Sequence, residues 1–462
     1  MHYRLKDNFL LRGWDLLPFA LYDAKTHSVN FFDKHAFSII SLCDGENFID
    51  INTLTSDQQR LLNDFISKDI VEKCDHVFPL NDRQKYIKFP CRYMASAHWS
   101  ITGKCNYKCR HCFMSATDVN ACELPLADIK KIIKELAECG IYSVSLTGGE
   151  PLVRDDFLEI LDALMDAQIN VDGVYTNGKL LNNELLDAFE ARNMKPTIHM
   201  SYDGKGWHDW IRGIPGAEKY VIDAFALCKE RGFATTAEMC IHKKNKDTFC
   251  ETVDKLADLN CMSLKINAAD ELGNWAKTST KYSLSVKEKD DIYLDYIKQF
   301  FENGMKISLQ LDSFFMCEKG STKYRLPLIQ NDSKLDYLKR VLCRSARNTL
   351  YISPEGIVLP CMPFVSTELK NTYPSILDNK LCDILSNSCY MKTIDTRLKE
   401  YFDFNPECNE CEHKGVCDGG CRAEAAIHNS NYMAKDLQAC YFFKNNYKEK
   451  IEKVVDSVLK KS

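Results

Sequence analysis

The amino-acid sequence predicts an α/β protein whose central parallel sheet is flanked by two smaller modules. Six strand-like segments alternate with helical patterns between residues 97 and 267, a short module of strands and helices precedes them, and cysteines gather in residues 343–440. A chain of 462 residues is long for one domain and typical of two or three. We expect domains at 1–88, 95–267 and 343–440, a connecting region at 268–342 and a closing segment at 441–462.

The first 88 residues contain strand-like segments followed by helical patterns. Phe9–Trp14 and Ser28–Phe32 are short apolar or aromatic segments on either side of the turn-like Tyr22–Thr26. Helical patterns follow in Lys34–Cys43 and Ser56–Ile66. This order in so short a stretch favours a winged-helix-like module.

From about residue 97 strands and helices alternate. The candidate strands are His98–Thr102, Tyr142–Leu146, Val171–Tyr175, Thr197–Ser201, Thr235–Ile241 and Ser263–Asn267. The helical patterns between them are Leu126–Glu138, Asp156–Ala167, Asn183–Arg192, Ala217–Arg231 and Lys246–Leu259. Gly140 and Gly232 follow two of these patterns, as glycines at helix C-termini do. Repeated βα units predict a parallel sheet with right-handed crossovers.

Fewer elements are expected after residue 267. The connecting region has helical patterns at Val286–Asn303 and Lys334–Val341, and an amphipathic helix at Lys444–Leu459 closes the chain.

The composition excludes several function classes. A net charge of −5, from 60 basic and 65 acidic residues, gives no support to a general nucleic-acid or anionic-membrane partner. No apolar run is long enough to span a bilayer, and the N-terminus lacks a signal-peptide core. We therefore expect a cytoplasmic protein. In a reducing compartment the 22 cysteines favour metal ligation over disulfides.

Three cysteines directly after the first candidate strand carry the strongest chemical signal. Cys105, Cys109 and Cys112 have the spacing C-x3-C-x2-C. Three thiolates so spaced can hold three corners of a [4Fe–4S] cubane and leave the fourth iron open to a ligand. The alternatives are a zinc site or three buried thiols. The position at the C-terminal end of a barrel strand, where such folds place their chemistry, favours the cluster.

Further motifs follow the next three candidate strands. Leu146-Thr-Gly-Gly-Glu-Pro151 ends the second, and its two glycines would let a ligand approach bare backbone. Tyr175-Thr-Asn-Gly178 and Ser201-Tyr-Asp-Gly204 end the third and fourth strands, and His208-Asp-Trp-Ile-Arg-Gly213 comes next. Each of these has an alternative interpretation as ordinary turn chemistry.

The C-terminal cysteines form a second constellation. Cys343 is followed after twelve residues by Gly356 and, after four more, by Cys361. The pattern C-x2-C-x5-C-x3-C then appears, and another cysteine follows eighteen residues later; these are Cys408, Cys411, Cys417, Cys421 and Cys440. A structural zinc ribbon is the alternative to iron–sulfur ligation.

The triad, with His111 before its last cysteine and a Gly-Gly-Glu motif one βα unit later, resembles the radical S-adenosylmethionine (SAM) superfamily. The resemblance implies a partial (β/α)6 TIM-like barrel. It also implies that SAM chelates the open iron and that electron transfer into its sulfonium releases a 5′-deoxyadenosyl radical, which abstracts hydrogen from a C–H bond. The family pattern places the residues that bind SAM at Gly148, Gly149, Glu150, Thr176, Ser201, Arg212 and His111.

The seven C-terminal cysteines resemble the SPASM domain, which implies two auxiliary [4Fe–4S] clusters. By this resemblance Cys343, Cys361 and Cys421 hold one cluster; the other is held by Cys408, Cys411, Cys417 and Cys440. One cubane with an open iron and two fully ligated cubanes need eleven cysteines, but the motifs supply ten. Either Cys317 or another nearby cysteine completes the first auxiliary cluster, or that cluster keeps an open iron. Cys317 is alternatively a buried structural cysteine.

Phe32–Gly45 in the N-terminal module is similar to modules that hold leader peptides by adding them as a strand to a sheet edge. The alternative is a small domain that only packs on the barrel. Together these resemblances predict a maturase of ribosomally made peptides, with a leader-bearing precursor peptide and a flavodoxin-type or ferredoxin-type electron donor as partners. A Cys thioether crosslink, as in sactipeptides and ranthipeptides, is the first choice of product.

Several alternatives stay open. Within the enzyme class they are carbon–carbon crosslinking, epimerisation, or modification of a small molecule or haem precursor. Outside it they are an iron–sulfur electron carrier or a zinc-ribbon scaffold protein. Sulfatase maturases of this architecture carry an Asp base directly after the cysteine that matches Cys361, but Met362-Pro363 stands here, so the general base is unassigned.

Overall fold

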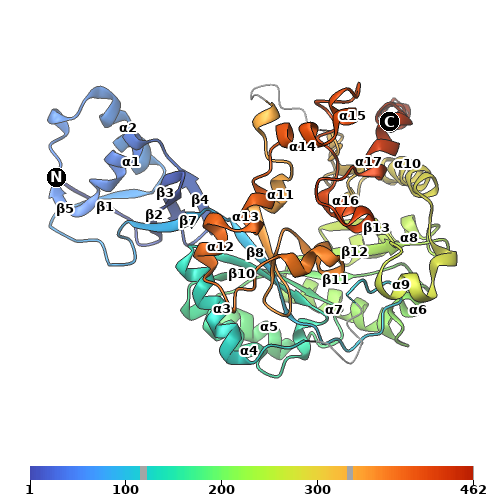
Figure 1. Cartoon of the computed structure of the whole chain (residues 1–462). Helices are drawn as coiled ribbons and strands as arrows, with labels where there is room; N and C mark the ends of the chain where they lie inside the picture. Colours follow the sequence, from blue (N-terminus) through green and yellow to red (C-terminus); the bar gives the residue numbers. More distant parts are fainter. Residues whose placement is uncertain (115–121, 330–336, 461–462) are drawn as a thin grey trace.

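The computed structural model of the chain describes residues 1–114, 122–329 and 337–460, which form three sheets with helices around them. The N-terminal domain (blue in Figure 1) projects to one side, and the C-terminal segment (orange to red) lies over one end of the central sheet. Within the described ranges, no helix is long and apolar enough to cross a membrane.

The central sheet confirms the predicted α/β fold. Its six predicted strands are parallel neighbours: β8 (Ser96–Thr102), β9 (Ser143–Gly148), β10 (Asn170–Thr176), β11 (Thr197–Ser201), β12 (Thr235–Ile241) and β13 (Ser263–Ala268). The five predicted helices between them are α3 (Leu126–Glu138), α4 (Phe157–Asp166), α5 (Asn183–Ala191), α7 (Ala217–Arg231) and α8 (Phe249–Asp258). Each helix buries an apolar stripe against the sheet, as Ile129, Ile133 and Leu136 of α3 do.

The sheet extends beyond the six predicted strands in both directions. β14 (Ser308–Leu311) pairs in parallel with β13, and β17 (Thr349–Ile352) pairs in parallel with β8. Antiparallel strands complete the two edges: β15 (Phe315–Cys317), β16 (Tyr324–Arg325) and β18 (Val358–Leu359). The added strands come from the expected connecting region and the cysteine-rich segment, so those segments share one sheet and one hydrophobic core with the barrel.

The predicted helices outside the barrel are found at α10 (Val286–Glu302) and α18 (Tyr447–Leu459). A helix was also predicted at 334–341. The first three of these residues lie outside the described ranges, and a 3₁₀ turn occupies Tyr337–Lys339. The cysteine-rich segment folds mainly into short helices: α11 (Arg344–Asn348), α12 (Leu381–Asn387), α13 (Cys389–Ile394), α14 (Leu398–Phe404), α15 (Pro406–Asn409), α16 (Arg422–Asn429) and α17 (Leu437–Lys444).

The N-terminal domain has a core of its own, built between two sheets and two helices. One sheet has the order β5 (Asp44–Phe48), β1 (His2–Leu5), β6 (Val71–Cys74); the other has the order β4 (Ser28–Phe31), β3 (Leu17–Asp23), β2 (Phe9–Asp15), β7 (Ile87–Arg92). The helices are α1 (Lys34–Ser41) and α2 (Ser56–Ser67), as the sequence predicted. Strand β3 was not predicted, because a tight turn at Leu16, with a φ of 65°, replaces the usual Gly or Asn signal.

Side chains from β2 and β3 fix this domain to the barrel. The Arg12 guanidinium donates to the Tyr142 hydroxyl at 2.6 Å, and the Trp14 indole donates to the Cys139 carbonyl at 2.8 Å. The rings of Tyr22 and Tyr142 stack with centroids 4.1 Å apart. These three side chains therefore hold the N-terminal domain against α3 and β9.

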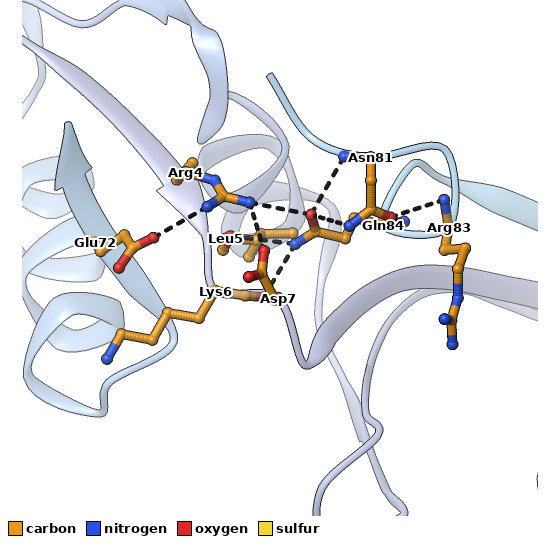
Figure 2. A network of polar contacts seen from close by, with 8 residues as sticks. All are labelled: Arg4, Leu5, Lys6, Asp7, Glu72, Asn81, Arg83 and Gln84. Atoms are coloured by element: carbon orange, nitrogen blue, oxygen red, sulfur yellow. Dashed lines mark hydrogen bonds and ion pairs between the residues drawn. The ribbon is translucent and has the colours of Figure 1, made fainter. Parts of the chain in front are cut away.

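A buried glutamine organises the N-terminal domain internally (Figure 2). Gln84 is fully buried; its amide nitrogen donates to the carbonyls of Leu5 and Lys6 at 3.2 and 3.0 Å. Its amide oxygen accepts from Arg4 at 3.3 Å and from the Asn81 side chain at 2.9 Å. The 81–84 turn is thus tied to the end of β1.

We expect Gln84→Ala to lower the free energy of unfolding of the N-terminal domain by about 1–3 kcal/mol, because two backbone carbonyls and a buried guanidinium lose partners. Urea denaturation followed by fluorescence measures the change. Lys85→Ala is the matched control: its ion pair with Asp82 is exposed, so its loss should change stability by less than about 0.5 kcal/mol. Equal effects of the two substitutions would contradict this account.

Candidate functional site

The loop after β8 brings the three predicted thiols of Cys105, Cys109 and Cys112 together. Burial, together with the neighbouring Cys109 and Cys112, raises the pKa of Cys105 to about 12. Burial also raises the pKa of Cys109, and Cys112 adds to the effect. Three half-buried thiolates that repel one another need a cation between them, and three such thiolates are the donor set of an iron–sulfur cluster.

The two glycines after β9 hold this loop in place. The Gly149 amide donates to the Thr102 carbonyl at 2.9 Å, and the Glu150 amide donates to the Lys104 carbonyl at 2.8 Å. A Cβ at Gly148, whose φ is 154°, would lie 2.3 Å from the Thr102 oxygen, and one at Gly149 would lie 2.3 Å from the Lys104 oxygen. The glycines therefore permit backbone-to-backbone contact with the triad loop, a different role from the bare surface for a ligand that the sequence suggested.

Glu150 is a buried carboxylate that accepts only from uncharged donors. It accepts from the Thr176 hydroxyl at 2.8 Å, from the Asn177 amide at 2.7 Å and from the Leu152 amide at 3.1 Å. Burial raises its pKa to about 7 although these hydrogen bonds oppose the shift. The site therefore suits a ligand with an ammonium group, such as the amino group of SAM.

The other end of the loop packs against a buried ion pair. Arg212, at the end of α6 (His208–Arg212), donates to Asp203 at 2.7 Å and to the Cys109 sulfur at 3.9 Å. Burial alone would raise the pKa of Asp203, but Arg212 and His208 hold it well below its usual range. Arg212 thus places a positive charge beside a cluster thiol, and its contact is with that thiol, not with an open ligand site.

His111 is neutral in this environment, because burial lowers its pKa to about 3. Its Nδ1 is buried and has no hydrogen-bond partner within the described part of the chain. An unsatisfied buried nitrogen beside the triad fits a ligand or cluster at this place.

Two further predicted residues lie at neighbouring strand ends. Thr176 ends β10 and Ser201 ends β11, so both lie at the same edge of the sheet as the triad. The Thr176 hydroxyl is engaged by Glu150, whereas the half-buried Ser201 hydroxyl has no hydrogen-bond partner among the described residues. Asn177, which the sequence analysis did not single out, donates to Asn106 at 2.7 Å and so joins β10 to the triad loop.

Cys343, Cys361 and Cys421 come together although 78 residues separate the first from the last. Burial raises the pKa of Cys361 well above its usual value, and Cys421 and Cys343 add to the shift. Tyr390 and Tyr432 lie close enough to Cys343 and Cys361 for their charges to interact, and both hydroxyls are buried without a partner in the described ranges. Two unsatisfied hydroxyls beside three thiols fit an iron–sulfur cluster, whose sulfurs accept hydrogen bonds.

The second predicted set lies next to the first. Cys440 and Cys408 both act on the pKa of Cys417, which burial raises to about 12, and the Cys411 amide donates to the Cys408 carbonyl at 3.3 Å. Asp436, which sequence reasoning missed, accepts from the Cys421 amide at 2.8 Å and caps α17, the helix that carries Cys440. This carboxylate therefore links the two cysteine sets.

Cys317 lies elsewhere. It belongs to β15, and its thiol donates to the carbonyls of Ser321 and Lys323 at 3.2 and 3.5 Å. Burial and Glu318 raise its pKa, and none of Cys343, Cys361 and Cys421 acts on it. The structure therefore does not bring Cys317 to Cys343, Cys361 and Cys421. Its position fits the alternative in which Cys317 is a buried structural cysteine.

The described residues contain no group of three or more His, Cys, Asp or Glu side chains placed to hold a single metal ion. In an iron–sulfur cluster each cysteine binds a different iron, so a cluster does not need its cysteines to converge on one metal ion. Cys421 also lines a hollow between the end of β14 and helices α16 and α17, where Asp312, Glu424 and Lys289 lie.

Two family models match the regions that carry these cysteines. Residues 99–256 match the radical SAM superfamily, and residues 343–412 match the SPASM iron–sulfur cluster-binding domain. The chain is a radical SAM enzyme with a SPASM domain. The two domains imply [4Fe–4S] clusters and SAM as its cofactors. The first match spans the triad and the Gly-Gly-Glu motif, and the second ends before Cys417, Cys421 and Cys440.

Known proteins similar to this radical SAM enzyme have more than one activity. The AdoMet-dependent heme synthase of Methanosarcina barkeri is 24% identical over 74% of this chain and 95% of its own length. The subtilosin biosynthesis protein AlbA of Bacillus subtilis is 24% identical over 78% of this chain and 73% of its own. The structure of Streptococcus suis SuiB bound to its precursor peptide SuiA is similar in fold, with a TM-score of 0.67 at 17% identity over 95% of this chain and 99% of SuiB.

The raised pKa of Glu150 predicts a pH-dependent stability. A carboxyl whose folded pKa, about 7, exceeds its unfolded value of 4.5 binds its proton more tightly when folded. The folded state therefore loses stability as pH rises from about 4.5 to 7, by on the order of 3 kcal/mol for this group. In Glu150→Gln this loss should be absent, as urea denaturation of the cluster-free protein under anaerobic, reducing conditions at pH 5 and 7.5 will measure.

Glu159→Gln is the control for this experiment, since Glu159 is exposed on α4. It should keep the wild-type difference between the two pH values. If the free energy of unfolding of Glu150→Gln falls between pH 5 and pH 7.5 as much as that of the wild type, another group is responsible for the loss.

Proposed function

We propose that this chain is a maturase of a ribosomally made precursor peptide and that it forms a crosslink, with a Cys thioether as the first choice. The observation that carries the proposal is the N-terminal domain. It has a core of its own, and Arg12, Trp14 and Tyr22 fasten it to the barrel. A separate domain fixed to a radical enzyme suits the task of holding a leader peptide while the core peptide reaches the barrel.

The likeness to SuiB supports this proposal because it extends over 95% of the chain and so includes most of the N-terminal domain. SuiB binds the precursor peptide SuiA, and AlbA serves the biosynthesis of the bacteriocin subtilosin. We further propose that the partners are a leader-bearing precursor peptide and a flavodoxin-type or ferredoxin-type electron donor. A reducing cytoplasm suits a chain with 22 cysteines, in which metal ligation is favoured over disulfides.

We assign the roles of the site residues as follows. Cys105, Cys109 and Cys112 hold the cluster that binds SAM. Residues around them hold SAM or its cluster in place: Gly148, Gly149, Glu150, Thr176, Ser201, Arg212 and His111. When bound, cluster and SAM supply a 5′-deoxyadenosyl radical that abstracts a hydrogen from a peptide carbon.

The chain's own groups orient this chemistry. The Glu150 carboxylate offers a buried negative charge to the SAM ammonium, which would lower the pKa of Glu150 from about 7 and so keep the carboxylate ionised. Arg212 balances the thiolate of Cys109 while Asp203 holds the guanidinium in position. Cys343, Cys361 and Cys421 hold one auxiliary cluster beside the hollow; Cys408, Cys411, Cys417 and Cys440 hold the other.

The placement of Cys317 predicts that it contributes no iron ligand. Cys317→Ser should keep the iron content of the wild type, whereas Cys361→Ser should lose about four irons. Iron analysis and the visible spectrum of anaerobically reconstituted protein measure this. Loss of iron in Cys317→Ser but not in Cys361→Ser would restore Cys317 as the eleventh ligand.

The proposed activity is tested by mass spectrometry of short peptides encoded beside the gene, each co-expressed with the enzyme under anaerobic conditions. We expect the loss of two hydrogens, with a substrate Cys that no longer reacts with an alkylating agent. Loss of two hydrogens with every Cys still free would indicate a carbon–carbon bond, and an unchanged mass that gains solvent deuterium would indicate epimerisation.

The control is the variant in which Cys105, Cys109 and Cys112 are all alanine. It should modify no peptide and cleave no SAM but keep the auxiliary clusters. SAM cleavage by the wild type with no peptide modified would favour the second candidate, a small-molecule or haem-precursor substrate, which the Methanosarcina barkeri relative supports.

A further inference from the structure

Five cations gather on the surface beside the triad loop. Lys108 and Arg110 belong to the loop, Lys243 and Lys244 follow β12, and Lys281 lies in the 3₁₀ turn Thr280–Tyr282. Lys108, Lys243 and Lys281 are exposed, and Arg110 and Lys244 are half-buried. None of the five forms an ion pair with a described residue. We call these five residues the cationic patch.

Aromatic side chains join the patch into one surface. The Arg110 guanidinium lies 4.8 Å from the centre of the Trp210 ring, and the Lys244 ammonium lies 4.9 Å from it. Lys244 also lies 4.7 Å from the Tyr282 ring, over which Lys281 lies at 5.0 Å. The Lys243 amide donates to the Tyr282 carbonyl at 2.9 Å. Four of the five cations are thus neighbours around Trp210 and Tyr282, and Lys108 stands two residues before Arg110 in the triad loop.

The patch borders the second half of the triad loop. Arg110 stands between Cys109 and Cys112, and its amide donates to the Ile211 carbonyl at 2.8 Å. The turn at Gly213 packs so closely on Lys108 that a Cβ there would lie 2.4 Å from the Lys108 oxygen. The first half of the loop lies beside Glu150 and Asn177, where SAM is proposed to bind.

The charge of this surface contrasts with the net charge of −5 of the whole chain. Two acidic groups belong to the same region: Glu288 interacts with Lys243, and Asp209 of α6 accepts from the amides of Gly216 and Glu218. A local excess of unpaired positive charge attracts an acidic partner and raises its association rate.

We propose that the cationic patch docks an acidic flavodoxin-type electron carrier that reduces the triad cluster. This inference rests on the proposed function, in which one electron must enter at Cys105, Cys109 and Cys112 from outside the chain. In the step the reduced carrier is oxidised by one electron and the cluster is reduced by one electron, with no atom transferred. Trp207, Trp210 and Tyr282, all half-buried, add apolar surface of the kind that an exposed flavin edge matches.

The test uses the reconstituted holoenzyme and a purified bacterial flavodoxin. Lys243→Glu with Lys281→Glu reverses two exposed charges of the patch without touching the triad loop. The matched control, Lys130→Glu with Lys453→Glu, makes the same change of net charge at two exposed lysines on α3 and α18. Interferometry at low ionic strength measures flavodoxin binding, and SAM cleavage is measured with reduced flavodoxin and, separately, with dithionite.

We expect the patch variant to bind flavodoxin about ten-fold more weakly and to lose flavodoxin-driven SAM cleavage to a similar degree. Dithionite-driven cleavage should stay at the wild-type rate, because dithionite is too small to need the patch. The control variant should behave as the wild type, and added salt should weaken wild-type binding more than binding of the patch variant.

Wild-type affinity in the patch variant, or an equal loss in the control, would overturn the proposal. So would wild-type enzyme that binds a ferredoxin, RNA or anionic vesicles at this surface but not flavodoxin. A wild-type enzyme that cleaves no SAM even with dithionite would refute the proposed function instead, and the binding measurement would still decide whether the patch docks flavodoxin.

Discussion

The position of the triad loop depends on two backbone hydrogen bonds between the end of β9 and the end of β8. Gly149 and Glu150 donate to Thr102 and Lys104 across a contact so close that any side chain at Gly148 or Gly149 would overlap a carbonyl oxygen. A substituted loop would have to move away, and the thiols of Cys105 and Cys109 would move with it. The same contact aims Glu150 inward, so the cluster site and the proposed SAM site are built by one local constraint.

Two buried carboxylates in this region behave in opposite ways, and the difference explains their roles. Asp203 has its cations already, in Arg212 and His208, and therefore stays ionised at a pKa below its usual range. Glu150 has only neutral donors, so burial dominates and its pKa rises to about 7. The charge of Asp203 is balanced within the fold. The hydrogen-bond donors of Glu150 are all neutral, so its carboxylate can pair with a cationic ligand.

The SPASM segment is joined to the barrel as one body. β17 continues the barrel sheet beyond β8, and the two regions share one hydrophobic core, so the auxiliary cysteines are fixed relative to the barrel mouth. The N-terminal domain differs, since it has a second core of its own, although Trp14, Ala20 and Phe89 pack in the barrel core. This arrangement (Figure 1) suits a rigid reaction centre with a distinct domain beside it.

The sequence by itself determined the six barrel strands, the main helices and the family, because periodicity and cysteine spacing are local properties of the chain. Only the tertiary structure decided which distant residues meet. It brought Cys421 to Cys343 and Cys361, kept Cys317 in a hairpin, and showed that the glycines before Glu150 serve backbone packing. It also added β14 and β17 to the sheet and gathered the cationic patch from three separate segments. These features depend on contacts between residues far apart in sequence, and no local pattern in the chain encodes such contacts.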